Sequence, residues 1–425
     1  MVSTFHGLEV GKRGLMVGQA SISTTGHNIA NANTKGYSRQ QVNAITSPSL
    51  DVWTSGAVNP GQLGTGVLME SITRVRDHFL DQQYRNQSGT LGEWSIRQET
   101  LDQLETVINE PSDTGLRTAM DQLAGAFQDL ANEPDSLSAK AVVKERAQAF
   151  IETIQSMDRS MTEMKKDLNQ QQTVKMNEAN GYLEQIAQLN DSIKRTGSQA
   201  NDLQDKRDVL IEELSKLVSI KVDNQADGTS NISLTDGTSL VEGASIKSKI
   251  DATSTFGGGE LSGIVKSLVI VDDYQTKLNA VAKDFVEANQ MSSPTDASQP
   301  GENLFSGDAD YSIASLKVNP NVENDMKQIT PLFTGMEEKS KAVNSSYRSL
   351  VSELGTESQT AIRQVANYEA TLQATDSRRQ SVTGVSLDEE MANLIKYQHS
   401  YSAAARMVST TDQMLDTIIN RMAAR

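Results

Sequence analysis

The end of the chain carries an apolar repeat that constrains the fold more than any other feature. From residue 387 onward, apolar or aromatic side chains recur at alternating intervals of four and three residues. This spacing places them along one side of an α-helix, as in the seam of a coiled coil. The eleven seam positions, nine of them apolar or aromatic, are Leu387, Met391, Leu394, Gln398, Tyr401, Ala405, Val408, Asp412, Leu415, Ile419 and Met422.

A matching stripe lies at the start of the chain, within a helix predicted from Ser3 to Lys35. Its members again follow the alternating spacing and are Leu8, Gly11, Leu15, Gly18, Ile22, Thr25 and Ile29. Glycine costs about 1 kcal/mol relative to alanine in a helix interior, so the glycines on this seam indicate that another backbone approaches closely. The segment is predicted to end at Asn31 to Gly36, where Gly36 can take the left-handed conformation that closes a helix.

Each stripe is narrow enough to be covered by one partner helix, and an isolated helix would leave it exposed to water. The two terminal helices are therefore predicted to pair with each other. Burial of the four large apolar residues Leu8, Leu15, Ile22 and Ile29 stabilises the helix pair by about 6 to 12 kcal/mol. Ordering the residues of such a helix costs about 1 to 2 kcal/mol of backbone entropy each, which makes a lone pair marginal. We therefore expect both ends to be largely mobile in the monomer and to order when neighbouring subunits cover their remaining faces.

Between the two ends, helical periodicity dominates from about residue 78 to 218, with breaks at 109–115 and 132–135. One stripe predicts a helix of more than fifty residues that ends near Gly197. Its methionines are interpreted as bundle core rather than as a binding groove. The strictest part of that stripe is Phe150, Ile154, Met157, Met161, Met164 and Leu168. Shorter helices are predicted at 200–217, 261–288 and 335–376.

Three segments of the middle have no helical period. Residues 37–77 contain several glycines between short apolar stretches and are interpreted as an extended, hairpin-like connector. Residues 219–256 contain the pairs Asp227-Gly228 and Asp236-Gly237 between alternating segments, which predicts a small antiparallel β element. Residues 291–334 hold four of the eight prolines and are predicted to be rich in loops. The predicted fold is therefore mainly α and elongated, with a long helical bundle and a small β element.

The composition argues against several functions. There are 39 Lys and Arg residues against 55 Asp and Glu residues, so a net charge of -16 disfavours nucleic acid and anionic membranes as partners. The chain has no cysteine, and its four histidines lie far apart, which disfavours a metal site. No nucleophile or acid pair suggests catalysis. We expect no enzyme activity, no cofactor and no small-molecule substrate.

Two segments carry a resemblance to a known family. Residues 26–40, GHNIANANTKGYSRQ, are similar to the signature of the bacterial axial flagellar proteins, which form the rod, hook and hook-associated structures. The preceding STFHGLE and the Ser-Arg-Gln after the tyrosine resemble the hook-associated protein 1 family more than hook or rod proteins. Residues 384–395, GVSLDEEMANLI, resemble the same family. Similarity is strong over about forty residues at each end.

The resemblance implies a structural subunit outside the cell, at the junction between the flagellar hook and the filament. It implies export through the flagellar type III channel without a cleaved signal peptide. The implied partners are further copies of the chain, hook protein, the next hook-associated protein and an export chaperone. Alternatives that remain open are a hook or rod protein, a secreted enzyme carried on flagellar-type ends, and an adhesive surface at 219–331.

The resemblance also implies that residues 291–334 are the vestige of a larger outer domain. The predicted domains are a terminal coiled coil (1–36 with 385–425), a connector (37–77), a helical bundle (78–218, 257–290 and 335–384), a β element (219–256) and this outer region (291–334). The predicted assembly interface consists of the two stripes without Thr25 and Asp412, and the predicted turn motif is Asn31, Asn33, Gly36 and Tyr37. Gln398 and Asp412 interrupt the second stripe, either because they face solvent or because they fix the alignment with neighbours.

Overall fold

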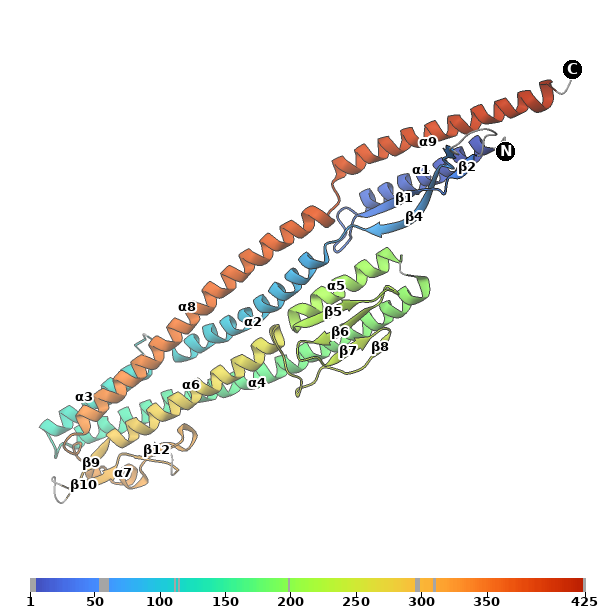
Figure 1. Cartoon of the computed structure of the whole chain (residues 1–425). Coiled ribbons are helices and arrows are strands. Elements are labelled where there is room, and N and C mark those ends of the chain that lie inside the picture. Colours follow the sequence, from blue (N-terminus) through green and yellow to red (C-terminus); the bar gives the residue numbers. More distant parts are fainter. Residues whose placement is uncertain are drawn as a thin grey trace.

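The chain forms an elongated molecule in which both termini lie at the same end (Figure 1). The computed structural model describes residues 5–52, 61–110, 112–113, 115–197, 199–294, 299–308 and 311–422. A terminal arm, residues 5–52, 61–77 and 384–422, occupies one end. A long helical region, residues 78–383, makes up the rest. This agrees with the predicted mainly α, elongated fold.

The arm contains two long helices side by side, α1 (His6–Ala30) and α9 (Leu387–Asp416), the latter continued by a π-helical turn (Thr417–Met422). A hairpin-like connector follows α1, as predicted. Its strands β1 (Gln40–Thr46) and β4 (Val67–Arg74) pair antiparallel, and so do β2 (Leu50–Val52) and β3 (Gly61–Leu63). The helix α1 ends at Ala30 and residues 31–36 form turns, which agrees with the predicted end of this segment at Asn31 to Gly36.

Six long helices build the helical region, and their bounds follow the sequence pattern closely. They are α2 (His78–Ile108), α3 (Leu116–Asn132), α4 (Leu137–Thr196), α5 (Asn201–Leu217), α6 (Glu260–Ala288) and α8 (Met336–Thr383). The 60 residues of α4 confirm the predicted long helix, and Gly197 ends it. The last of these helices, α8, runs seven residues beyond its predicted end at residue 376.

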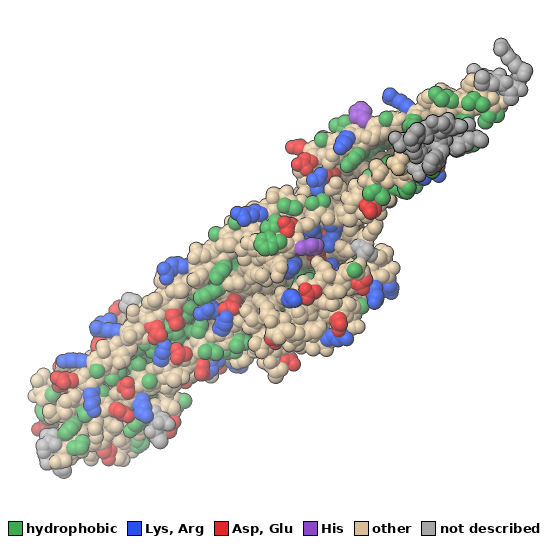
Figure 2. All heavy atoms as spheres, viewed as in Figure 1, with side chains coloured by type: hydrophobic (Ala, Val, Ile, Leu, Met, Phe, Trp, Pro, Cys, Tyr) green, Lys and Arg blue, Asp and Glu red, His purple; other side chains and the backbone are tan. Residues whose placement is uncertain are grey.

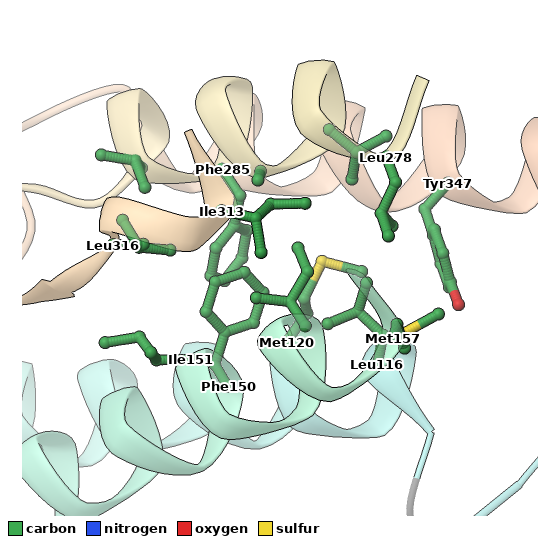
Figure 3. Close-up of a cluster of buried hydrophobic side chains, with 14 of the residues drawn as sticks. Leu116, Met120, Phe150, Ile151, Met157, Leu278, Phe285, Ile313, Leu316 and Tyr347 are labelled. Carbon is green, nitrogen blue, oxygen red and sulfur yellow. The ribbon is translucent and has the colours of Figure 1, made fainter. Parts of the chain in front are cut away.

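The main apolar core lies in the half of the helical region that is remote from the arm. Phe150 on α4 faces Phe285 on α6, with ring centroids 4.3 Å apart (Figure 3). All six members of the predicted α4 stripe are buried there, which confirms that its methionines belong to the bundle core. Close packing of apolar side chains from several helices therefore holds this half together.

A second apolar cluster joins the other half of α4 and α5 to a small sheet. The sheet has the order β5 (Ile220–Asn224), β6 (Ser230–Leu234), β7 (Ser239–Glu242) and β8 (Ser245–Ile246), all antiparallel. Gly228 and Gly237 have positive φ in the predicted Asp-Gly turns. This confirms the predicted β element.

The described residues between 291 and 334 form more regular structure than their predicted loop-rich character suggested. They form β9 (Gln290–Ser292), β10 (Pro300–Asn303), β11 (Phe305–Ser306), β12 (Lys317–Val318) and the short helix α7 (Pro320–Asn324), with single 3-10 turns between. Leu304, Phe305 and Ile313 are fully buried in the main core. The segment thus covers α4 and α6. Its buried apolar residues have no regular spacing in the sequence, but they pack against the same core.

Within the described ranges, none of the helices is both long enough and apolar enough to cross a membrane.

Candidate assembly site

The two terminal helices meet along a groove made of glycines. Four glycines of α1 line the side that faces α9: Gly7, Gly11, Gly14 and Gly18. A Cβ atom on Gly11 would lie only 2.7 Å from Cγ2 of Val408, and one on Gly18 would lie 3.4 Å from Cβ of Tyr401. The glycines thus admit side chains of α9 close to the α1 backbone, as the sequence predicted for Gly11 and Gly18. Since Gly7 faces Thr411, the helices run antiparallel.

The apolar residues of the first stripe lie beside this groove rather than at its centre. Leu8, Leu15, Ile22 and Ile29 are all half-buried. The buried positions of α1 are small or polar, and they are Gly11, Gly18, Ser21, Thr24, Thr25 and Asn28. Close backbone contact therefore replaces much of the expected apolar seam, and the coiled-coil geometry itself stays a prediction.

The second stripe is only partly buried within the monomer. Leu394, Ala405, Val408 and Leu415 are half-buried, while Leu387, Met391, Gln398, Tyr401, Asp412 and Ile419 are exposed. Met391 is 56% exposed and Ile419 is 60% exposed. The side chain of Met422 lies outside the described residues. Hydrophobic side chains accordingly reach the surface along this arm (Figure 2), and their role in assembly stays a prediction.

The turn after α1 presses against α5. Gly36 has φ +79°, and a Cβ there would lie 2.1 Å from Cγ2 of Val209, so both the conformation and the space favour glycine. Gly36 does not close the helix as predicted, because α1 already ends at Ala30 and is capped by Asn31, whose side-chain amide donates to the carbonyl of His27 at 3.0 Å. Asn33 is exposed.

Asn28 connects three elements of the arm and was not among the predicted site residues. It is 1% exposed, and all its amide hydrogen-bonding positions are used. Its Nδ2 donates to the carbonyl of Gln40 at 2.9 Å and to Oε2 of Glu390 at 3.1 Å. Its Oδ1 accepts from the Gln40 backbone at 3.0 Å and from the Tyr37 hydroxyl at 2.7 Å. One side chain thus fixes α1, β1 and α9 relative to one another.

Tyr37, a member of the predicted turn motif, belongs to the same polar network. Its hydroxyl also lies 3.0 Å from Nδ1 of His27. Burial, together with the charges of Asp202, Asp205 and Glu390, raises the pKa of Tyr37 above its ordinary value. The hydroxyl consequently stays protonated and able to donate to Asn28.

Glu390 is the buried acidic partner of this network. Its side chain is 2% exposed and pairs with Nε of Arg39 at 2.7 Å. Ser386 caps the start of α9 by accepting from the backbone N–H of Glu389 at 3.5 Å, and the Glu389 side chain pairs with Arg39 at 3.2 Å.

Arg39 also spans the link between α8 and α9. Its backbone N–H donates to the carbonyl of Thr383, the last residue of α8, at 3.0 Å. Its guanidinium meets α9 through the two glutamates just described. The start of the connector thus binds both sides of the short segment 384–386. No spacing rule identifies such a residue in the sequence, since its partners lie about 350 residues away.

Comparisons with known proteins agree with these features. Residues 101–250 match the family described as flagellar hook-associated protein FlgK helical domain, and residues 377–422 match that described as flagellar basal body rod FlgEFG protein C-terminal. Flagellar hook-associated protein 1 of Bacillus subtilis (strain 168) is 33% identical over an alignment of 502 positions. This alignment covers 99% of this chain and 99% of the relative. The chain belongs to the flagellar hook-associated protein 1 family.

Two further matches have lower sequence identity. The protein of Escherichia coli (strain K12) is 24% identical over 96% of this chain and 98% of its own length. A solved structure of the flagellar hook junction protein FlgK from Burkholderia pseudomallei has 23% identity and a TM-score of 0.47, covering 53% of this chain and 46% of that one.

Membership of the hook-associated protein 1 family confirms the resemblance that the terminal motifs indicated. It makes this chain a structural protein of the bacterial flagellum, located outside the cell and in contact with other hook and filament proteins. It also bears out the prediction that the chain is not an enzyme, because the family is a structural one. Among the described residues, no group of three or more acidic or histidine side chains is placed to hold a metal ion.

Proposed function

We propose that this chain joins the flagellar hook to the filament and that it assembles through its paired terminal helices. The proposal rests on the unequal burial of the two sides of α9. One side of that helix lies in the glycine groove of α1, while Leu387, Met391 and Ile395 on its outer side are about half exposed. Large apolar side chains exposed in a row favour burial against another protein surface.

The assembling unit in this proposal consists of residues 1–36 and 385–425, and its partners are further copies of the chain and related axial proteins. Hook protein lies on one side and the next hook-associated protein on the other. The helical bundle is the outer part of the subunit. The predicted interface residues on both helices then become buried when neighbours pack around the arm.

Truncation tests this proposal. A chain without the residues before Thr34, or without those after Ser386, lacks one of the paired helices but retains the whole helical region. Such chains should fail to enter flagella, and electron microscopy should show hooks without filaments, as in a deletion strain, together with flagellin shed into the medium. The circular dichroism of each truncated chain controls for folding of the remainder. Motile flagella built from either truncated chain would contradict the proposal.

Export is a separate part of the proposal. We propose that the chain passes through the flagellar type III channel unfolded, without loss of a signal peptide, and that a chaperone holds α9 beforehand. The exposed apolar side chains of α9 support the need for such cover in the cytoplasm. The intact mass of the subunit recovered from flagella should equal that of the full chain, whereas a shortened N-terminus would exclude this route.

A further inference from the structure

The two apolar clusters of the molecule stop short of the terminal arm. Their fully buried members all lie between Leu101 and Ala361. Within the described ranges, therefore, no cluster of buried apolar side chains continues from the helical region into the arm. Some other kind of contact must determine the direction in which the arm extends.

Charged side chains make that contact. Arg74, at the end of β4, reaches two carboxylates of α5: its Nη1 lies 2.8 Å from Oδ1 of Asp205 and 2.8 Å from Oδ2 of Asp208. Arg76, just before α2, lies 2.7 Å from the same Asp208 oxygen. Asp205 also accepts from the backbone N–H of Ser38 at 3.0 Å and from its hydroxyl at 2.7 Å. Both ends of the connector are thus bound to one face of α5.

A second layer ties these groups to α2 and α8. Arg76 forms two parallel hydrogen bonds to Asp81 on α2, each 3.0 Å long. Arg379, near the end of α8, pairs with Glu212 on α5 and lies 4.0 Å from the ring centroid of Tyr84. The two points at which the chain enters and leaves the arm are therefore held by the same network.

The network is balanced in charge and largely buried. It contains four arginines and four carboxylates, none with a side chain more than 18% exposed: Arg74, Arg76, Arg207, Arg379, Asp81, Asp205, Asp208 and Glu212. Burial by itself would raise the pKa of Asp208, but Arg76, Arg74 and Arg207 hold that pKa below its ordinary value. Asp208 therefore stays charged as the partner of these three arginines. We call these eight residues the ion-pair joint.

We infer that the ion-pair joint sets the angle between the arm and the helical region, and that it can open while both apolar cores remain intact. Charge pairs with bidentate geometry define direction well, since each hydrogen bond has a preferred angle. They also carry little apolar contact across the boundary, so their loss exposes little of either core. The arm is therefore attached to the helical region through a joint that can separate while the helical region stays folded. This inference does not depend on which proteins the arm assembles with.

Distance measurements between spin labels test the joint directly, because a chain without cysteine accepts labels only where cysteines are introduced. One pair, Gln41→Cys on β1 and Ser95→Cys on α2, spans the joint. A second pair, Ser95→Cys and Gln188→Cys on α4, lies within the helical region. All three positions are exposed. In the otherwise unchanged chain both pairs should give a single narrow distance distribution.

Arg76→Met, or separately Asp205→Asn, should remove the narrow peak of the pair across the joint and leave the pair within the helical region unchanged. Lys249→Met is the matched control, because Lys249 forms an exposed ion pair with Glu184 at 2.9 Å, away from the joint, and it should alter neither distribution. A peak across the joint that stays narrow in both variants would overturn the inference. So would loss of the distance within the helical region, since the joint would then be part of the core.

Discussion

The helical region and the terminal arm are both built from long helices, yet they are held together in opposite ways. In the helical region, large side chains such as Phe150, Phe285 and Leu123 are buried in a continuous apolar core. In the arm, the buried positions of α1 are glycines and polar residues, and Glu390 is the one buried residue within the span Leu387–Asp416. The first region therefore has an apolar core of its own, whereas the arm has no buried large apolar side chain among its described residues.

In the proposed function, this difference separates the part that folds from the part that assembles. A core of interdigitated apolar side chains stabilises a domain without help from other molecules. A glycine groove buries little apolar area, so its specificity comes from shape and from a few hydrogen bonds. A subunit that must fold alone and then join a larger structure benefits from having both.

The largest effect should come from opening the core of the helical region. Phe150→Ala removes a fully buried ring that contacts Phe285, and we expect it to lower the free energy of unfolding by about 3 to 5 kcal/mol. Thermal and chemical unfolding followed by circular dichroism measure this loss. Val174→Ala, at an exposed position of the same helix, should change stability by less than about 0.5 kcal/mol.

A smaller effect should follow from Asn28→Asp in the arm. The substitution replaces the donor that serves Gln40 and Glu390 by an oxygen and brings a second negative charge beside Glu390. We expect the α1–α9 pair to lose about 3 kcal/mol and the helical region to keep its stability. Amide exchange resolved by segment, measured in assembled flagella where α1 and α9 are expected to be protected, compares both regions. Asn33→Asp at an exposed position is the control. Equal destabilisation of the two regions would show that they are not independent.

Closing the glycine groove should have a comparable but somewhat weaker effect. Gly11→Val places methyl groups where Val408 already lies, and overpacking of this kind costs about 1 to 3 kcal/mol. Incorporation into flagella should drop while the melting of the helical region is unchanged. Gly26→Ala is the control, because nothing lies within 4 Å of a Cβ at Gly26, and it should stabilise α1 by up to about 1 kcal/mol. Similar behaviour of the two variants would contradict the groove.

The smallest effect should come from Gln398→Leu on the exposed side of α9. In the monomer its side chain is exposed, so the stability should change by less than about 0.5 kcal/mol. Its effect in the assembled state discriminates between the two interpretations of this position. Unchanged assembly favours a solvent-facing residue, and a misaligned or weakened assembly favours a residue that fixes alignment. Co-sedimentation with flagella measures that outcome.

Much of the fold could be predicted from the sequence, because helices and Asp-Gly hairpins have short-range patterns. The bounds of α4 and α5 and the turns at Gly228 and Gly237 follow from local rules. The cap formed by residues 291–334 could not be predicted, because its buried residues have no common period and meet only in three dimensions.

The candidate site was predicted only in outline. Gly11 and Gly18 could be placed on the α9 side of α1 because their spacing repeats. Asn28, Arg39 and Glu390 could not be found in this way, since their partners are distant in sequence and each residue type is common on helix surfaces. The one signal for Asn28 was its place within the signature motif, which does not reveal a hydrogen-bonding partner more than 360 residues away.

Amide exchange of α1 and α9, measured in the dilute monomer and again in assembled flagella, tests the central claim most directly. The account predicts fast exchange of both helices in the monomer, slow exchange of both after assembly, and slow exchange of the core of the helical region in both states. Strong protection of α1 and α9 in the dilute monomer would contradict it, because the terminal helices would then need no neighbours in order to fold.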